Sequence, residues 1–138
     1  MQDKDCLFCK IIAGALPCYK IYEDAHTFAF LDIAPSVEGH CLVVPKQHTR
    51  SFLTADADTI AKVMRSAQKV ANYFVDSCGF TGARVSMNCE ESAGQVVWHW
   101  HVHVLPYMDD TYAKSQKRIK PDASAERLAE LHSKLKMM

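Results

Sequence analysis

The stretch of sequence that decides the fold is residues 98–106, Trp98-His99-Trp100-His101-Val102-His103-Val104-Leu105-Pro106. Histidine alternates in it with apolar residues, which is the period of a β-strand and not of a helix. The pattern predicts a strand with His99, His101 and His103 on one face, each roughly 7 Å from the next. We expect the tryptophans and valines to face the core. We expect Pro106 to end the strand, because proline donates no hydrogen bond to a sheet.

Three histidines on one face of a strand favour a functional site over packing. A single histidine on a half-exposed strand is usually a structural polar residue. Here three histidines recur at every second position, on the face opposite two tryptophans, and packing alone does not explain such a row. Its spacing is not that of a helical HExxH zinc site. Near neutral pH, imidazole can act as a nucleophile, as an acid or base, or as a metal ligand. A row of three therefore indicates side chains with different tasks in one site.

The composition is that of a globular domain without net charge. The chain has 138 residues, enough for one domain, with 16 basic and 16 acidic residues. This balance argues against nucleic-acid or membrane binding driven by charge, but it allows a small anionic ligand. No apolar run reaches the ~18 residues of a membrane span, and the polar start is unlike a secretory signal. We therefore expect a cytoplasmic protein, with the nucleus as a second candidate compartment. Its six cysteines are expected to be reduced thiols, with Cys6 and Cys9 as the exception.

Periodicity and turn residues predict one α+β domain with an antiparallel sheet. The expected helices cover residues 6–14, 56–78 and about 123–136. The expected strands cover residues 19–23, 27–31, 40–44, 84–88 and 98–106. The middle helix is the clearest, because one apolar stripe recurs in it at three-and-four spacing. Thr54 or Asp56 is its candidate N-cap, Gly79 is its C-terminal stop, and Pro45 is expected to end the third strand.

The segment beyond residue 106 is basic and polar, and we expect it to be solvated. Its cations are Lys114, Lys117, Arg118 and Lys120. The whole chain, 1–138, is predicted to be a single domain, with a basic tail and a C-terminal helix in 108–138. His26 and His132 have no partner pattern, so we expect them on the surface.

Cys6 and Cys9 form a C-x₂-C pair, a spacing that lets both thiolates reach one tetrahedral zinc ion. Redox pairs share this spacing, but their usual βαβ context is absent from the pattern of predicted elements. A closed zinc site needs two more ligands, and His48 and His99 are the natural candidates. Four protein ligands would make the zinc structural, tying the N-terminal segment to the sheet. The alternative is a pair of ordinary thiols beside a solvated His48.

These residues resemble a known family, the histidine triad (HIT) family of nucleotide hydrolases and transferases, and more closely its Hint-like branch. The signature is His99-Trp100-His101-Val102-His103-Val104-Leu105, after the matching approach Gly94-Gln95-Val96-Val97-Trp98. Residues 30–35 and 39–46 look like the family's nucleoside-binding half, and 6–14 look like its zinc-carrying members. The match covers about residues 6–107. It implies a HIT-like fold, with an antiparallel sheet of about five strands, one long helix packed on it and short terminal helices.

The resemblance implies a hydrolase that cleaves at the α-phosphate of purine nucleoside 5′-phosphoramidates or related AMP conjugates. Family members attack the α-phosphorus with the middle histidine, here His101, and water then releases the nucleoside monophosphate from a covalent nucleotidyl-histidine. The nucleophile needs a free ring nitrogen, so its other nitrogen should be held by a backbone carbonyl. His103 would donate to the phosphate oxygens. His40 and Asn88 match positions that orient the third histidine or contact the phosphate and leaving group.

The resemblance also implies the ligand contacts. Asp32 matches the residue that accepts the ribose hydroxyls, and Gln95 matches a phosphate-side contact. The full nucleotide-binding set is Phe8, Asp32, Ile33, Asn88, Gly94, Gln95, His101 and His103. In zinc-carrying relatives the counterparts of Cys6, Cys9, His48 and His99 hold a structural Zn²⁺. Without the resemblance, the residue pattern is equally compatible with Asp32 as a turn residue and with Phe8 and His40 as core residues.

Two positions depart from the family pattern. Val96 stands where Hint members usually carry a hydroxyl residue that helps to protonate a departing amine, and Tyr107 stands where many relatives have arginine. One alternative is therefore a dinucleoside polyphosphate hydrolase like the Fhit branch, although Asn88 resembles the Hint branch and Fhit-like members tend to have glutamine there. A second alternative is a nucleotide-binding interaction protein without catalysis.

The expected partners are a purine nucleotide and a second copy of the chain, with neither nucleic acid nor membrane. The nucleotide follows from the resemblance. The homodimer is also implied by it, with the helix over 60–75 and one edge of the sheet at the interface.

Overall fold

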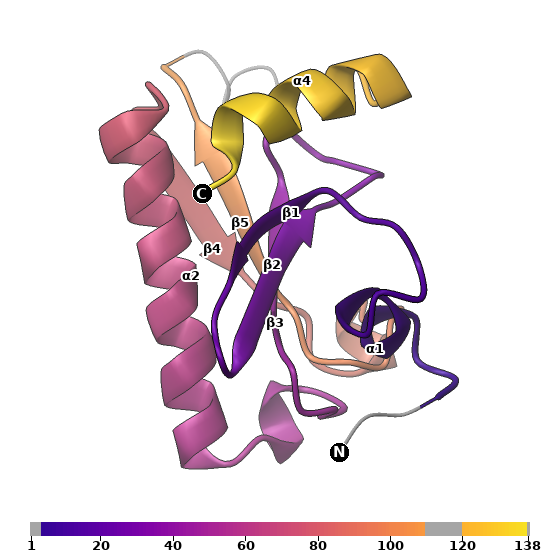
Figure 1. The fold of residues 1–138 in the computed structure, drawn as a ribbon. Helices are drawn as coiled ribbons and strands as arrows, with labels where there is room; N and C mark the ends of the chain where they lie inside the picture. The colour runs from indigo at the N-terminus through magenta and orange to yellow at the C-terminus, as the bar shows by residue number, and fades with distance from the viewer. Residues whose placement is uncertain (1–3, 110–119, 138) are drawn as a thin grey trace.

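The computed structural model describes residues 4–109 and 120–137, which form one antiparallel sheet of five strands with helices around it (Figure 1). The strand order is β1-β2-β3-β5-β4, and the strands are β1 Lys20–Glu23, β2 Thr27–Leu31, β3 Cys41–Pro45, β4 Gly82–Ser86 and β5 Val102–Tyr107. The α-helices are α1 Leu7–Ile12, α2 Ala57–Ser77 and α4 Ala125–Leu135, and two 3₁₀ turns cover Phe52–Thr54 and Glu91–Ala93. This arrangement confirms the predicted α+β class and its five strands.

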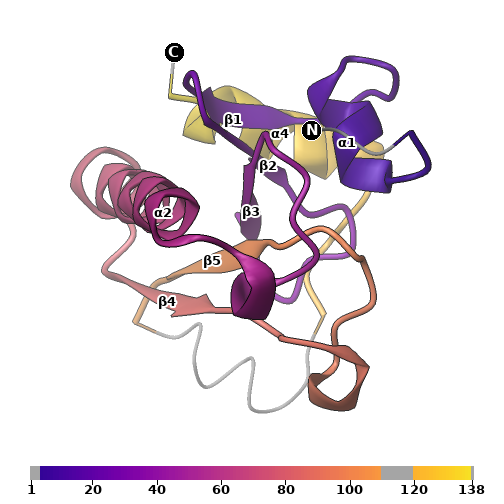
Figure 2. The same ribbon diagram turned by 90° about the horizontal axis from the view of Figure 1, so that it is seen from below.

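The long helix α2 packs on one face of the sheet and forms the main core there (Figure 2). Its buried apolar side chains recur at the predicted spacing, and they are Val63, Ala67, Val70 and Phe74. They pack with buried residues of β3 and β5, among them Val43 and Val102. Asp56, and not Thr54, is the N-cap, because its carboxylate accepts the Thr59 amide at 2.7 Å. Gly79 follows the helix with a φ of 86°, which glycine adopts without strain, so the predicted stop is confirmed.

The other face of the sheet carries a smaller core under α1 (Figure 2). Phe8 of α1 packs there with Phe28 and Phe30 of β2 and with Leu42 and Val44 of β3. A helix of six residues is too short to be stable alone, so these contacts with the sheet hold α1 in place. The helix begins where predicted, after an N-cap whose sulfur accepts the amide at the third helical position.

The histidine strand is shorter than predicted. β5 begins at Val102, and residues 98–101 lie outside the sheet. The Trp100 amide donates to the Thr49 carbonyl at 2.7 Å instead of joining a ladder. β3 also pairs with β5 over three residues only. Trp100 is buried as expected, but Trp98 is 37% exposed, so the prediction that Trp98 faces the core is wrong.

The two prolines predicted to end strands differ: Pro45 ends β3 as predicted, whereas Pro106 lies inside β5. Pro45 is the last residue of β3 and pairs with Thr27 of β2. Pro106 lies within β5 and pairs with Ala83 of β4, past the residues of β5 that pair with β3. Each proline therefore has a paired strand on one side only, where the missing N–H costs least. The strand predicted over 84–88 is observed at Gly82–Ser86, because its register with β5 starts two residues earlier.

The C-terminal helix α4 lies against β1 and adds three leucines to the core, Leu128, Leu131 and Leu135. This part of the prediction is confirmed. His132 is not a plain surface residue, because its Nε2–H donates to the Lys20 carbonyl at 2.8 Å and its ring meets Tyr19. The predicted cations Lys114, Lys117 and Arg118 lie outside the described residues, and Lys120 is exposed.

None of the six cysteines forms a disulfide, as the sequence led us to expect. His26 is exposed, also as expected. Within residues 4–109 and 120–137, no helix combines the length and the apolarity that a bilayer crossing requires.

Candidate active site and metal centre

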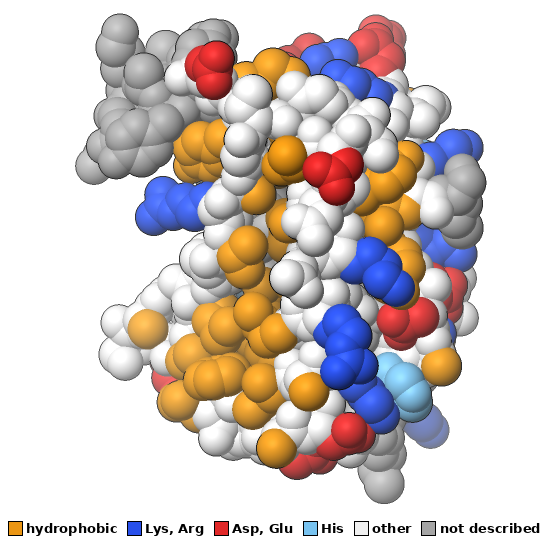
Figure 3. Space-filling view, turned by 90° about the vertical axis from the view of Figure 1, so that its left-hand side faces the viewer, with side chains coloured by type: hydrophobic (Ala, Val, Ile, Leu, Met, Phe, Trp, Pro, Cys, Tyr) orange, Lys and Arg blue, Asp and Glu red, His pale blue; other side chains and the backbone are white. Residues whose placement is uncertain are grey.

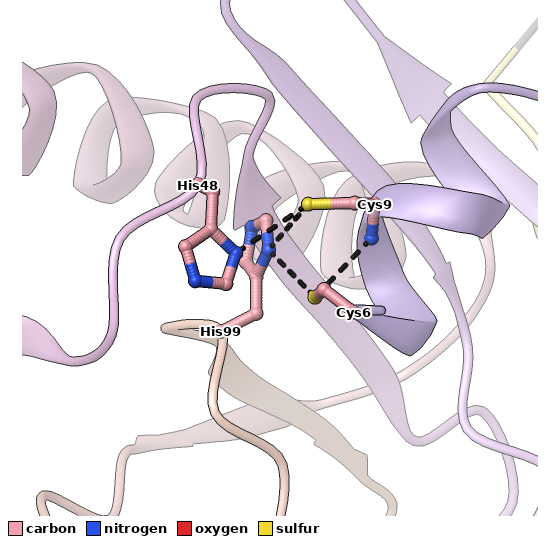
Figure 4. A group of neighbouring side chains, drawn as sticks. All are labelled: Cys6, Cys9, His48 and His99. Atoms are coloured by element: carbon pink, nitrogen blue, oxygen red, sulfur yellow. Dashed lines mark hydrogen bonds between the residues drawn. The ribbon is translucent and has the colours of Figure 1, made fainter. Parts of the chain in front are cut away.

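The three histidines of the predicted row have three different environments. His99 is fully buried, His101 is 7% exposed, and His103 is half-buried. The rings of His101 and His103 are neighbours, with centroids 5.1 Å apart. His99 instead faces the cysteines at the start of the chain (Figure 4). Because residues 98–101 lie outside the strand, His99 can face the cysteines while the rings of His101 and His103 remain neighbours.

His101 has one ring nitrogen free for chemistry. Its Nδ1 lies 2.8 Å from the His99 carbonyl oxygen, which can only accept, so Nδ1 carries the proton. Nε2 then keeps an unshared electron pair. Burial lowers the pKa of His101 below its usual value, and the hydrogen bond to His99, which raises the pKa, does not compensate. A neutral imidazole with a bare Nε2 is the form that a nucleophilic histidine needs.

His103 is oriented by a chain of hydrogen bonds that starts at a backbone amide. The Ser36 amide donates to His40 Nδ1 at 3.0 Å, so His40 carries its proton on Nε2. That Nε2–H donates to His103 Nδ1 at 2.8 Å, which leaves the His103 proton on its own Nε2. Burial, then the nearby His101 and His40, lower the pKa of His103 to about 4. His103 therefore presents an N–H donor without a positive charge at neutral pH.

Asp32 lies at the edge of this chain. One carboxylate oxygen accepts the Ala34 amide at 2.8 Å, and the other lies 3.7 Å from His40 Nε2. The carboxylate is partly exposed, so it remains able to accept hydrogen bonds from a ligand.

The four residues predicted as metal ligands lie together beside His101 (Figure 4). Cys9 Sγ is 3.4 Å from His48 Nδ1, and His99 Nδ1 is 3.4 Å from Cys6 Sγ and 3.5 Å from Cys9 Sγ. His99 Nε2–H donates to the Pro45 carbonyl at 2.8 Å, so His99 Nδ1 is the nitrogen left to bind a metal.

The cluster has the dimensions of a tetrahedral zinc site. With Zn–S near 2.3 Å and Zn–N near 2.0 Å, a regular tetrahedron places sulfur and nitrogen ligands about 3.5 Å apart. The observed sulfur–nitrogen distances of 3.4–3.5 Å match this value. Two thiols and two imidazoles are also a common donor set for structural zinc. Cys6, Cys9, His48 and His99 therefore fit a Zn²⁺ ion.

A cavity of about 470 Å³ opens between α1 and the histidines. Its walls are mostly apolar, with Leu7, Phe8 and Ile11 from α1 and with Leu16, Phe30, Val96 and Val97 from other segments. Asp32, Ile33, His101 and His103 also line it. Phe8 packs edge-on against His101, with ring centroids 5.2 Å apart. The cavity thus brings together five of the predicted nucleotide-binding residues: Phe8, Asp32, Ile33, His101 and His103.

The three remaining predicted residues lie in the loop before the histidines, and they are Asn88, Gly94 and Gln95. The side chain of Gln95 does not face the cavity. Gln95 is 2% exposed, its amide oxygen accepts the Glu90 amide at 2.8 Å, and its NH₂ group donates to Arg50 O and Val97 O. These bonds use its side chain to hold the loop in shape. Asn88 donates to the Ala93 carbonyl at 2.6 Å and lies against Gly94, which has a φ of 93°.

Comparison with known proteins now identifies the family. A family model described as the HIT domain matches residues 13–110. The chain belongs to the HIT domain family. It is 36% identical over 107 residues to the adenosine 5′-monophosphoramidase hnt1 of Schizosaccharomyces pombe, covering 78% of this chain and 77% of the relative. It is 35% identical over 102 residues to the adenylylsulfatase HINT3 of Arabidopsis thaliana, covering 74% of this chain and 52% of the relative.

A crystal structure of a zinc-bound histidine triad family protein from Mycobacterium smegmatis resembles the chain along nearly its whole length. The TM-score is 0.80 at 32% identity, over 95% of this chain and 93% of the other. This likeness confirms the predicted HIT-like fold.

The loop that carries Asn88 in this HIT domain has a support that the sequence did not reveal. Glu90 has φ 76° and ψ 164°, a region that is nearly limited to glycine. Arg50 holds the Glu90 carboxylate with two hydrogen bonds of 3.0 Å, and its guanidinium lies 4.3 Å from the centre of the Trp98 ring. No sequence pattern links positions 50 and 90. The role of Ser36 was not predictable either, because it donates through its backbone amide, which every residue except proline would supply.

Proposed function

We propose that this protein is a nucleotide hydrolase that cleaves at the α-phosphate of purine nucleoside 5′-phosphoramidates or related AMP conjugates. His101 is the nucleophile and forms a covalent nucleotidyl-histidine. The observation that carries the proposal is the 2.8 Å hydrogen bond between His101 Nδ1 and the His99 carbonyl, because it leaves Nε2 unprotonated. The activity in the name of the Schizosaccharomyces pombe relative agrees with this substrate class.

The reaction takes two displacements at the same phosphorus atom. In the first, His101 Nε2 bonds to phosphorus, and the leaving group departs with the electron pair of the bond that breaks; the nitrogen of a phosphoramidate takes up a proton from solvent as it leaves. In the second, water attacks phosphorus, the P–N electrons return to His101, and a proton of the water passes to solvent. His103 Nε2–H donates to a phosphate oxygen, where negative charge must be stabilised. His40 acts as a positioning residue, since its hydrogen bond fixes which nitrogen of His103 carries the proton.

The nucleoside occupies the 470 Å³ cavity under α1, which is within the usual size range of small-molecule sites. Phe8 and Ile33 are apolar surfaces for the base, and Ile33 is 70% exposed and so accessible to it. The Asp32 carboxylate accepts the ribose hydroxyls. Asn88 lies beyond His103, where its amide can contact the phosphate or the leaving group.

Cys6, Cys9, His48 and His99 hold a structural zinc ion in this proposal. Zinc would supply a cross-link that ties α1 to the segments around His48 and His99 and would take no part in the displacements. The ligand distances support this role, and so does the zinc-bound Mycobacterium smegmatis relative. Because α1 also carries Phe8, the ion would hold one wall of the nucleoside cavity in place.

A homodimer completes the proposal. β4 pairs with β5 alone, so its other edge is unpaired among the described strands, and four of its five residues are exposed. Open sheet edges favour pairing with another strand. The adjoining face of the molecule, which α2 crosses, shows gathered hydrophobic side chains (Figure 3). Exposed or half-buried apolar residues of these two elements include Ile60, Met64, Val75 and Val85.

The test is steady-state hydrolysis of adenosine 5′-phosphoramidate and of a diadenosine polyphosphate, side by side. We expect the wild-type protein to release AMP from the phosphoramidate, and we expect His101→Ala to abolish the release. The matched control is His26→Ala, which removes an exposed histidine outside the site and should leave the rate unchanged.

The other outcomes decide between the alternatives. Preference for the polyphosphate would move the protein to Fhit-like chemistry. If neither substrate is hydrolysed while AMP still binds, the protein is a nucleotide-binding module and the enzyme proposal fails. Retained activity in His101→Ala would exclude His101 as the nucleophile.

A further inference from the structure

Glu90 has a backbone conformation that needs support from its neighbours. Its φ of 76° and ψ of 164° lie in a region nearly limited to glycine, and no other non-glycine residue within 4–109 and 120–137 has a positive φ. A residue keeps such a conformation only where surrounding contacts impose it. The Glu90 side chain does not cap the 3₁₀ turn that follows, and it does not line the nucleoside cavity. The role of Glu90 therefore lies in the shape of the loop around it.

Arg50 contacts the loop of residues 88–98 at three points. Its Nε and Nη2 each donate to a carboxylate oxygen of Glu90 at 3.0 Å, and its guanidinium lies 4.3 Å from the centre of the Trp98 ring. Its backbone carbonyl accepts the Gln95 NH₂ group at 2.7 Å. An exposed ion pair alone adds little stability, but a two-pronged pair of guanidinium and carboxylate fixes the relative orientation of its partners. Arg50 therefore holds the Glu90 side chain in one place.

The peptide groups of Glu90 are bonded as well. The Glu90 amide donates to the Gln95 side-chain oxygen at 2.8 Å, and the Glu90 carbonyl accepts the amides of Ala93 and Gln95, both at 3.1 Å. The 3₁₀ turn Glu91–Ala93 thus starts from the Glu90 carbonyl. Because φ and ψ of Glu90 set the direction of this carbonyl, a relaxation of the Glu90 backbone moves the whole turn.

The turn ends at the group that orients Asn88. Asn88 Nδ2 donates to the Ala93 carbonyl at 2.6 Å, and a Cβ added to Gly94 would lie 3.0 Å from the same nitrogen. The Asn88 amide is therefore packed against the turn and follows its position. Asn88 and His103 line the same cavity, so the turn also decides where this amide lies relative to His103.

We propose that Arg50 is a positioning residue for Asn88. It holds Glu90 in a conformation suited to glycine, and Glu90 in turn shapes the turn that orients the Asn88 amide. This inference rests on the proposed hydrolysis, in which Asn88 contacts the phosphate or the leaving group. Arg50 itself takes no part in either displacement. A glycine at position 90 should make Arg50 dispensable, because glycine adopts the same φ and ψ without help.

The experiment measures kcat and KM for adenosine 5′-phosphoramidate with wild type, Arg50→Gln, Arg50→Lys and the double variant Arg50→Gln/Glu90→Gly. Arg50→Gln is also combined with Asn88→Ala and compared with Asn88→Ala alone. Arg65→Gln is the matched control, because Arg65 is an exposed arginine on α2 that does not line the nucleoside cavity. Amide hydrogen exchange over residues 89–95 is measured on the same proteins without substrate, so that the loop is followed independently of activity.

We expect Arg50→Gln to lower kcat by about tenfold or more, as a small displacement of a positioned group does. KM should stay within about twofold, because the residue-50 carbonyl still bonds Gln95 and so keeps the adjoining cavity wall in place. The amides of Ala93 and Gln95 should exchange about tenfold faster. Arg50→Lys should recover part of kcat, since lysine keeps the charge but not the two-pronged geometry. Arg65→Gln should change none of these values.

The double variants decide whether Arg50 acts through Glu90 and Asn88. Arg50→Gln/Glu90→Gly should return kcat and amide protection to near the wild-type values, and Arg50→Gln should cost nothing further in the Asn88→Ala protein. An unchanged kcat in Arg50→Gln, a loss that Glu90→Gly does not repair, or a further loss in the Asn88→Ala protein would overturn the inference while the proposed hydrolysis stands. No hydrolysis by wild type would overturn the proposed function and, with it, the role of Arg50.

Discussion

Replacing Asp24 with asparagine should lower the free energy of unfolding by about 2 kcal/mol at pH 7. The Asp24 carboxylate is half-buried at the turn between β1 and β2. It accepts the backbone amides of His26 and Thr27, both at 2.8 Å, and the hydroxyls of Thr27 and Tyr22, both at 2.9 Å. The Ser66 hydroxyl of α2 adds a fifth bond at 3.3 Å. These bonds tie the turn to the helix.

The magnitude follows from the pKa of this carboxyl. Burial raises the pKa of Asp24, but the hydrogen bonds outweigh burial and hold it at about 2, against an ordinary value of 3.8. A difference of nearly two units corresponds to roughly 2.5 kcal/mol, which solvent screening of this partly exposed carboxylate reduces to about 2 kcal/mol. Because the folded-state pKa is the lower one, the stabilisation is complete above about pH 4 and is lost as the pH falls through about 2. Roughly half of it should be gone at pH 3.

The assay is urea denaturation of wild type and Asp24→Asn at several pH values between 7 and 3. The stability gap between the two proteins should narrow as the pH falls. Asp56→Asn is the control, because Asp56 is an exposed N-cap and asparagine caps a helix as well as aspartate does. An Asp24→Asn protein as stable as wild type at pH 7, or a gap that stays constant with pH, would show that the Asp24 carboxylate does not stabilise the fold in this way.

Three further predictions concern the site. His40→Ala should lower kcat by about 100-fold with little change in KM, because His103 loses the bond that fixes its proton; an unchanged kcat in steady-state assays would contradict this. Removal of metal with a chelator, or Cys9→Ser, should weaken AMP binding in a calorimetric titration, because α1 carries both a metal ligand and one wall of the nucleoside cavity. An unchanged affinity for AMP would show that the metal site does not hold this wall in place. Glu90→Gly should raise the melting temperature by a few degrees, because relief of the strained backbone outweighs the loss of an exposed ion pair with Arg50. A lower melting temperature would contradict this prediction.

The sequence predicted those parts of the fold that depend on local pattern. The helix after Asp56 has a full apolar stripe, an N-cap and a glycine stop, and all of these act within the segment itself. The C-x₂-C pair likewise indicated a metal site, because one turn of helix brings both sulfurs to one side. Here short-range geometry decides the structure, so a single sequence is sufficient.

The rest depends on contacts between distant segments. The alternating pattern predicted a strand from Trp98, but the Trp100 amide bonds to Thr49, and this contact ends the ladder at Val102. Gln95 looked like a ligand contact, yet its amide holds the loop through Arg50 O. Only the folded chain brings Arg50 to the Glu90 carboxylate. No periodicity in the chain carries that information.

In the proposed reaction, His101 takes the nucleotide in one displacement and releases it in a second. The most direct test of this reaction is the stereochemical course of hydrolysis at the α-phosphorus, with a substrate made chiral there by sulfur and turned over in oxygen-labelled water. Each displacement inverts the phosphorus, so two displacements through His101 predict overall retention. Overall inversion would show that water attacks the substrate directly, and the account of His101 as nucleophile would be wrong.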